Sequence, residues 1–236
     1  LGIERVVIVQ PSPYGTDNRC TLDGMAALGG RARGVAVIGE ETTDGELGRM
    51  HAQGIRGVRL NLETAGQRDP AAAGRRLEWA SARVAPLGWH VQTYTNLNVI
   101  GALAGLIRSL PTPLVVDHFG AARMEKGVAQ PGFDALLGLV GEGKTYVKLS
   151  APHRGSDLAD CADAAPLARA LIAANPDRML WGSDWPHAAA KRAPDFTREA
   201  IEPYDRIDDG PASAGAALPP SATSTPSAST TRPRFR

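Results

Sequence analysis

Six apolar runs in this sequence end at or next to a side chain that could bind a small molecule or move a proton. Together these side chains supply hydroxyl, amide, imidazole, guanidinium and carboxylate groups. One polar residue at the end of a strand means little, because loops are polar, but six that face one rim would make a plausible site. The residues are Ser12, Asn61, Tyr94, His118, Ser150 with Arg154, and Asp184.

The segment LWGSDWPH, residues 180–187, carries the sharpest of these signals. Asp184 follows an apolar run and lies near Trp181 and Trp185, so we expect it to be partly desolvated. Such a carboxylate suits metal ligation or removal of a proton from water. Asp184 could instead cap the next helix. His187 is either a second polar group on the rim or an exposed loop histidine, and we favour the loop.

The segment LVVDHFG, residues 114–120, gives the second signal. Side chains alternate in direction along a strand, so only one of Asp117 and His118 can point toward the mouth of a barrel. We predict that His118 contacts substrate or metal and that Asp117 faces the helices. A lone histidine on a strand is more often structural, so its pairing with Asp184 decides the matter.

Three arginines lie near predicted strand ends, namely Arg56, Arg59 and Arg154. A guanidinium group binds carboxylates in a bidentate way, so arginines at a barrel mouth favour a carboxylate-bearing ligand. A solvated arginine is the alternative at each place, and it is the better interpretation for Arg56. Ser12 and Tyr14 could bind a carboxylate or simply form a turn. His51 and His90 are interpreted as structural.

Short β-branched runs alternate with longer helical patterns, which is typical of parallel strands covered by helices. The strand count exceeds that of most doubly wound sheets, and no glycine-rich phosphate loop follows the first strand. We therefore predict an incomplete (β/α)₈ barrel of about seven βα units and favour it over the alternative, an open sheet. Catalytic residues of such barrels lie at the C-terminal ends of the strands. The predicted strands are 5–10, 34–38, 57–61, 90–94, 114–118, 146–150 and 179–183, and the predicted helices are 22–28, 44–53, 71–84, 98–110, 132–141 and 163–174.

Composition separates a folded part, residues 1–207, from a tail, residues 208–236. The whole chain is 43% hydrophobic and 22% charged, as in globular proteins. The tail is rich in Ala, Ser, Pro and Thr and reads as disordered low-complexity sequence. It stands where the final barrel helix is expected. It is either a natural tail or the product of a lost reading frame.

The net charge and the cysteine content indicate which classes of binding partner and which cellular compartment to expect. A net charge of +1 gives no field that would favour nucleic acid or an anionic membrane. No signal peptide or membrane-spanning run is predicted. The two cysteines form no CxxC pair, so a reducing, cytoplasmic setting is expected.

Taken together, the motifs resemble the amidohydrolase-related TIM-barrel family, in particular the branch that contains 2-pyrone-4,6-dicarboxylate lactonase. The resemblance runs from Glu4 to His187 in the family's order, and WGSDWPH after VVDHFG is its most specific part. The matching segments are VQPSPYGTDN, GIRGVRLN, GWHVQTY, VVDHFG, YVKLSAPHR and DRMLWGSDWPH.

The resemblance implies addition of water to a lactone or a related carbonyl of a small carboxylate-bearing substrate. It implies that Asp184 is the general base and that His118 polarises the carbonyl or binds a metal. It further implies that the substrate is held by Ser12, Arg59, Tyr94 and Arg154. One divalent metal such as zinc, bound by Asp184 and His118, is an open alternative to a metal-free site.

Two features depart from the family pattern. The HxH pair expected at the end of the first strand is absent, so the chain is expected to begin at strand two. The arginine expected after DHxG is Ala121 here, with Arg123 displaced, and Arg68 is a loose stand-in for another arginine. Dicarboxylate specificity is therefore open. The alternatives are a metal-dependent decarboxylase of the same superfamily or a truncated, inactive chain.

Overall fold

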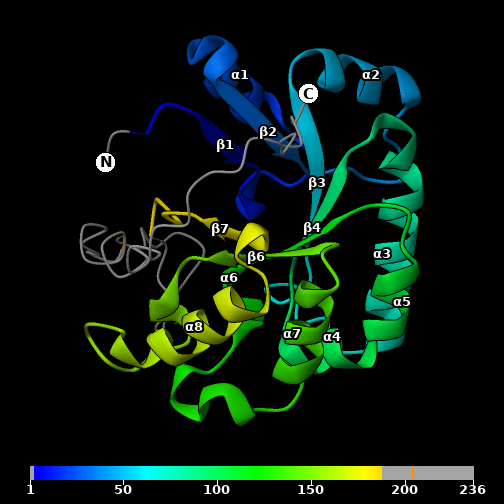
Figure 1. The fold of residues 1–236 in the computed structure, drawn as a ribbon. Helices are drawn as coiled ribbons and strands as arrows, with labels where there is room; N and C mark the ends of the chain where they lie inside the picture. The colour runs from blue at the N-terminus through cyan, green and yellow to red at the C-terminus, as the bar shows by residue number, and fades with distance from the viewer. Residues whose placement is uncertain (1–2, 188–203, 205–236) are drawn as a thin grey trace, which may run out of the picture.

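Seven parallel strands lie side by side in chain order and curl with helices around their outer side (Figure 1). The computed structural model describes residues 3–187 and residue 204. The arrangement is an incomplete (β/α)₈ barrel, as predicted. The predicted boundary at 207/208 and the tail lie outside the described residues. The strands are β1 (Val6–Val9), β2 (Ala32–Ala36), β3 (Ile55–Asn61), β4 (His90–Tyr94), β5 (Leu114–Val116), β6 (Thr145–Leu149) and β7 (Met179–Trp181).

The helices begin and end at residues whose side chains suit those positions. Thr43 and Glu46 form a capping box at the start of α2 (Asp44–Ala52), and Asp69 caps α3 (Pro70–Val84) with a proline in the first turn. Gly88, at φ 65°, closes the turn after α3. The remaining α-helices are α1 (Arg19–Ala27), α4 (Leu97–Ala102), α5 (Ala104–Ser109), α6 (His118–Ala121), α7 (Phe133–Gly141) and α8 (Ala165–Ala174).

The predicted helix 98–110 is two helices, α4 and α5, which meet at Leu103. Gly101 and Gly105 flank this break, and glycine is a poor helix former. Gly101 also lies close to the backbone of Gly132, where a Cβ would sit 3.3 Å from the Gly132 Cα. A side chain at position 101 would therefore push α4 slightly away from the start of α7.

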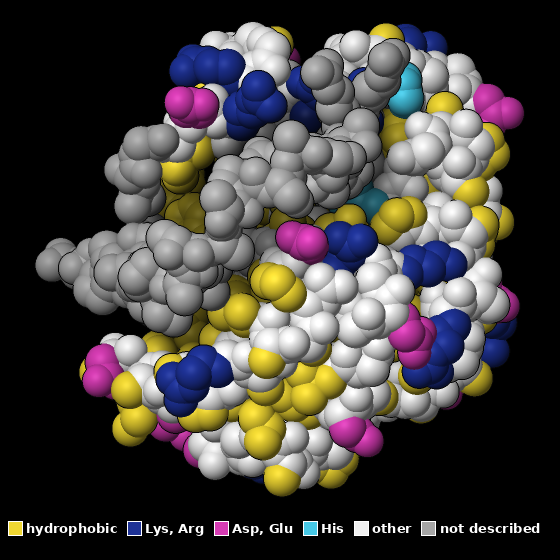
Figure 2. All heavy atoms as spheres, viewed as in Figure 1, with side chains coloured by type: hydrophobic (Ala, Val, Ile, Leu, Met, Phe, Trp, Pro, Cys, Tyr) yellow, Lys and Arg dark blue, Asp and Glu magenta, His cyan; other side chains and the backbone are white. Residues whose placement is uncertain are grey.

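The apolar core lies between the strands and the surrounding helices. Val58, Val91, Val116 and Val147 are each at most 1% exposed and belong to one hydrophobic cluster with residues of α3, α7 and α8. Burial of this apolar surface is the main favourable contribution to folding. Among the described residues, every helix is too short or too polar to cross a membrane. The face of the molecule in Figure 2 carries charged side chains of both signs close together.

The strand predicted to end at His118 differs most from expectation. It was predicted to include His118 but ends at Val116, because His118 adopts φ 50° and leaves the extended conformation. The next residues, Phe119, Gly120 and Ala121, are also left-handed, at φ 54°, 67° and 51°. The segment labelled α6 is therefore a left-handed turn at the mouth of the barrel, not a regular helix.

Candidate active site

His118 and Asp184 meet at the C-terminal ends of β5 and β7. His118 Nε2 lies 3.4 Å from Asp184 Oδ1, and His118 Nδ1 lies 2.8 Å from Ser150 Oγ. Arg154, in the 3₁₀ turn η5 (Pro152–Arg154), donates from Nε to Asp184 Oδ2 at 2.9 Å. Residues from three strand ends thus fix one imidazole–carboxylate pair. Tyr94, the last residue of β4, packs its ring edge-on to His118, with 5.0 Å between the centroids.

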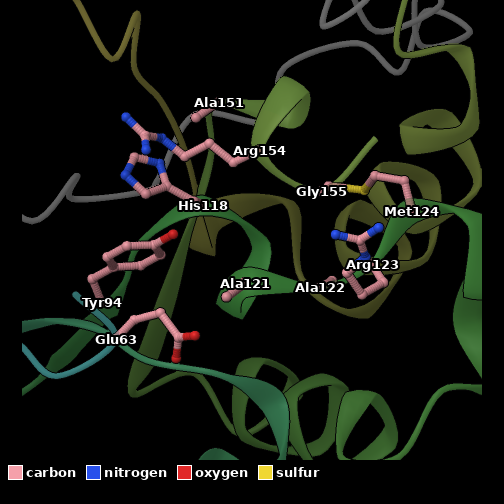
Figure 3. Close-up of a pocket in the computed structure, with 10 residues that line it drawn as sticks. All are labelled: Glu63, Tyr94, His118, Ala121, Ala122, Arg123, Met124, Ala151, Arg154 and Gly155. Carbon is pink, nitrogen blue, oxygen red and sulfur yellow. The ribbon is translucent and has the colours of Figure 1, made fainter. Parts of the chain in front are cut away.

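A pocket of about 150 Å³ opens beside His118 (Figure 3). Three of the residues predicted for the site line it, namely Tyr94, His118 and Arg154. Ser12, Arg59 and Asp184 do not line it, although all three lie at the same end of the sheet, and Asp184 contacts two residues that do, His118 and Arg154. The lining residues are Glu63, Tyr94, His118, Ala121, Ala122, Arg123, Met124, Ala151, Arg154 and Gly155.

Burial sets the protonation of the two rings that line the pocket. Burial lowers the pKa of His118 below its ordinary value, so the imidazole is neutral at pH 7. Burial raises the pKa of Tyr94, so its phenol keeps its proton and can donate a hydrogen bond. The pocket therefore offers a neutral histidine and a phenol donor.

Backbone strain is concentrated around this pocket. Of the six non-glycine residues with positive φ among those described, His118, Ala121, Ala151 and Asp184 belong to the strand ends that form the site. A left-handed conformation is costly for a residue with a side chain and persists only where the surrounding structure enforces it. At His118 the conformation turns the imidazole toward Asp184 and Ser150.

A second polar cluster lies deeper, on the inner face of the sheet, around Asp117. Its carboxylate accepts from Arg59 Nε at 3.1 Å and from Gln92 Nε2 at 2.9 and 3.0 Å, and it pairs with Lys148 Nζ at 3.0 Å. Asp117 is 1% exposed. Burial raises its pKa, but Lys148 and Arg59 outweigh burial and bring the pKa to about 2.

The prediction that Asp117 faces the helices is wrong. Alternation along β5 puts Asp117 on the same face as Val115, which is the inner face. His118 does not continue the alternation because its left-handed backbone ends the strand. The side chains of Asp117 and His118 therefore both lie on the inner side of the barrel.

Ser12 and Arg59 form a third group, next to Asn61. Ser12, in η1 (Ser12–Tyr14), accepts from Arg59 Nη1 at 3.2 Å and from the Asn61 amide. Arg59 thereby links this group to Asp117. These residues are brought together with one another, but no contact joins them to Asp184 within the described part of the chain.

The other candidates lie outside the pocket. Arg56 donates to backbone carbonyls at His51 and Ile55, and Tyr14 is 52% exposed. His187 is buried, at 5% exposure, with its ring edge-on to His153, so the exposed-loop interpretation is wrong. Trp185 is 76% exposed and Trp181 39%, so Asp184 is shielded by Arg154 and His118 and not by indole rings.

Lining residues missed at the sequence level include Glu63 and Arg123. Arg123, interpreted above as displaced, lies in the pocket wall and pairs with Glu125 at 3.1 Å. No sequence signal separates Glu63 from other loop carboxylates. Lys148 and Gln92 contact Asp117 and do not line the pocket. The sequence could have placed them on the inner face of the sheet, because alternation puts them on the same face as Ser150 and Tyr94.

The described residues do not by themselves form a zinc site. His118 and Asp184 would supply two ligands, whereas catalytic zinc takes three protein ligands. No group of three or more His, Cys, Asp or Glu side chains suited to a metal occurs within residues 3–187 and 204. The guanidinium of Arg154 on Asp184 also opposes a cation at that carboxylate.

A family model described as amidohydrolase matches residues 1–218. The chain belongs to the amidohydrolase family. It is 37% identical over 201 residues to a 2-pyrone-4,6-dicarboxylate hydrolase of Comamonas testosteroni, across 81% of this chain and 65% of that protein. It is 36% identical over 201 residues to a 4-sulfomuconolactone hydrolase of Hydrogenophaga intermedia, across 82% and 65%. The chain thus spans about 65% of the length of these two relatives.

A solved structure agrees with the fold. The chain matches a crystal structure from Pseudomonas putida, assigned provisionally as a 2-pyrone-4,6-dicarboxylic acid hydrolase, with a TM-score of 0.70 and 37% identity. That match covers 78% of this chain and 68% of the other. The match therefore supports the incomplete-barrel fold.

Proposed function

We propose that this amidohydrolase hydrolyses a lactone of a small carboxylate-bearing molecule, with Asp184 and His118 as the catalytic pair. The observation that carries the proposal is the 3.4 Å contact between His118 Nε2 and Asp184 Oδ1 at the edge of a pocket. A carboxylate next to a neutral imidazole suits general-base attack by water. Relatives named as lactone hydrolases support the same reaction class.

Asp184 accepts a proton from a water molecule, which attacks the lactone carbonyl carbon. The tetrahedral intermediate then collapses with cleavage of the ring C–O bond, and the proton moves from Asp184 to the departing oxygen. The product is a hydroxy acid that loses one proton to solvent. Arg154 fixes the orientation of Asp184 through its bond to Oδ2.

His118 stabilises the negative charge that develops on the carbonyl oxygen. With Ser150 as a donor to Nδ1, Nε2 carries the proton and can donate it in a hydrogen bond. The lowered pKa of His118 keeps the ring neutral, and the phenol of Tyr94 is a second donor beside it. Such preorganised donors contribute most in a water-poor site.

The substrate carboxylate is bound by one of the two arginines in the pocket wall, which lie on different sides of it (Figure 3). Arg154 and Arg123 both line the pocket, so a carboxylate placed beside either one meets a guanidinium group. Ser12 and Arg59 lie at the same end of the sheet but outside the pocket. They are proposed to contact the end of the substrate that is farther from Asp184. Asp117 holds Arg59 in place for this role.

Proton release measured by pH-stat tests the proposal directly. We expect the full chain to release one proton per molecule of a carboxylate-bearing lactone, and a His118→Asn variant to turn over about 10²-fold more slowly. The control is His51→Asn, because His51 lies on α2 against Trp89 and outside the pocket. Equal turnover by both variants would show that His118 has no catalytic role.

The same assay after dialysis against a chelator separates metal-free from metal-dependent hydrolysis. An unchanged rate supports the Asp184–His118 mechanism. A lost rate that zinc restores would contradict it and would assign carbonyl polarisation to a metal. A cytoplasmic setting for the reaction stays a prediction, which fractionation of cells that express the chain would check.

A further inference from the structure

The pocket beside His118 contains a carboxylate, Glu63, that the proposed reaction does not use. Glu63 follows β3, and its backbone N–H donates to the Tyr94 carbonyl at 2.9 Å. Its Oε2 accepts from Asn96 Nδ2 at 2.9 Å, while Asn96 itself caps α4 through Val99 N–H. Both the backbone and the side chain of Glu63 are therefore held in position.

The carboxylate of Glu63 keeps one oxygen, Oε1, for which the described residues supply no hydrogen-bond donor. Figure 3 shows the Glu63 carboxylate pointing into the space between Tyr94 and Ala121. Within the described residues, no side chain donates to its Oε1 and no cation forms an ion pair with it. Oε1 is therefore a hydrogen-bond acceptor for a bound molecule.

The opposite charge lies elsewhere in the same pocket, on Arg154 and Arg123. Each guanidinium already contacts carboxylates, Arg154 that of Asp184 and Arg123 those of Glu125 and Asp157. Ala121, next to Glu63 in the wall, offers only a methyl group. The pocket thus accommodates one substrate anion near the arginines but presents like charge to a second anion near Glu63.

We propose that Glu63 is a specificity-determining residue that accepts a hydrogen bond from a substrate hydroxyl. The preferred substrate is then a lactone with one carboxylate and at least one free hydroxyl on the ring or its side chain. A flat lactone with two carboxylates and no hydroxyl is disfavoured. This inference rests on the proposed lactone hydrolysis.

Two lactones and one isosteric variant test the proposal. The probes are D-glucaro-1,4-lactone, which has hydroxyls and one carboxylate, and 2-pyrone-4,6-dicarboxylate, which has two carboxylates and no hydroxyl. We expect the wild type to prefer the first. We expect Glu63→Gln to lower kcat/KM for it about tenfold, mainly through KM, and to raise kcat/KM for the second about tenfold.

Matched variants separate recognition from general damage. Glu78→Gln removes the same charge from an exposed position on α3 and is expected to leave both values unchanged. Asn96→Ser keeps a helix-capping hydroxyl but is too short to hold Glu63. We therefore expect the ratio of kcat/KM for the hydroxylated lactone to kcat/KM for the dicarboxylate to fall by a smaller factor, about threefold. Asn96→Ser also tests the proposal if Glu63→Gln fails to fold.

Failure of this inference can be told from failure of the proposed function. If the wild type hydrolyses lactones but Glu63→Gln leaves the ratio of the two kcat/KM values unchanged, the role of Glu63 is refuted and lactone hydrolysis stands. If the wild type hydrolyses neither probe, the proposed function fails for both probes. Calorimetric titration with D-glucaro-1,4-lactone then decides, because tenfold weaker binding to Glu63→Gln supports the role and equal or absent binding overturns it.

Discussion

Asp117 and Asp184 both follow strands of one sheet and both contact an arginine, yet their surroundings differ. Asp117 is 1% exposed and is enclosed by Arg59, Lys148 and Gln92. The side chain of Asp184 is 17% exposed, and its oxygens contact Arg154 and His118, which both line the pocket. One carboxylate is fully satisfied by fixed donors, whereas the other remains accessible to water.

The difference supports separate tasks for the two carboxylates, in line with the proposed mechanism. A buried carboxylate with two cations cannot take up a proton near neutral pH, and the pKa of Asp117, about 2, agrees with this. Such a group can only hold its neighbours in place. Asp184 is the better candidate for a general base, because it contacts His118 and Arg154, which both line the pocket. The comparison therefore predicts that one aspartate governs stability and the other turnover.

The largest expected effect is the loss of turnover in Asp184→Asn. Removal of the general base should lower kcat about 10³-fold, or about 4 kcal/mol of transition-state stabilisation, with little change in thermal stability. Lactone hydrolysis by pH-stat and thermal unfolding of the same sample measure both quantities. Asp23→Asn, on an exposed face of α1, is the control. Retention of more than a tenth of the activity would remove Asp184 from the mechanism.

The next effect is the loss of stability in Asp117→Asn. Arg59 and Lys148 would remain buried without a counter-charge, which should cost about 3 kcal/mol of unfolding free energy. Asp44→Asn is the matched control, because it breaks the exposed pair with Arg83 and should cost less than about 1 kcal/mol. Urea unfolding measures both. Equal costs for the two variants would contradict a structural role for the buried cluster.

Much of the fold and part of this comparison could be predicted from the sequence. The strand-and-helix rhythm predicts parallel strands covered by helices, and the number of strands favours a barrel over an open sheet. Polar residues at the ends of apolar runs identify His118, Tyr94 and Arg154 as pocket-lining residues. The meeting of His118 with Asp184 follows from the rule that the C-terminal ends of parallel strands share one edge.

The rest depends on backbone conformation that residue patterns do not encode. Alternation predicts that neighbours point to opposite faces, but His118 is left-handed and escapes the rule. Asp117 was therefore assigned to the wrong face. Glu63 and Arg123 lie in loops, where no periodicity constrains direction, and only tertiary contacts bring them to the pocket wall. His187 is buried and packs edge-on against His153, which no local signal indicates.

A pH titration of stability sharpens the comparison, because it separates Asp117 from a buried histidine. Burial and then Lys148 lower the pKa of His90 from 6.5 to about 4. Between these values the unfolded chain binds a proton that the folded chain does not, so the free energy of unfolding should fall as the pH falls. The contribution of His90 is about 2 kcal/mol from pH 6.5 to 4.

His90→Gln should remove this dependence, since glutamine does not titrate. Asp117 contributes in a lower window, because its depressed pKa keeps its contribution intact above about pH 4 and loses it toward pH 2. Urea unfolding of both proteins at several pH values gives the difference curve. Parallel curves for wild type and His90→Gln between pH 6.5 and 4 would show that another group causes acid lability.

The smallest expected effect comes from Ser150, which positions His118 without touching the substrate. Ser150→Ala removes the 2.8 Å contact to Nδ1, so the imidazole loses its fixed orientation. We expect kcat to fall about tenfold with KM unchanged, and Ser150→Thr to restore most of it because the hydroxyl returns.

Ser81→Ala is the control, because Ser81 is also a buried serine with one hydroxyl partner, Thr112 at 2.7 Å. A similar loss of stability in both alanine variants, with kcat lowered only in Ser150→Ala, would tie the effect to the imidazole and not to the buried hydroxyl. An unchanged kcat in Ser150→Ala would mean that Asp184 and Tyr94 alone orient His118.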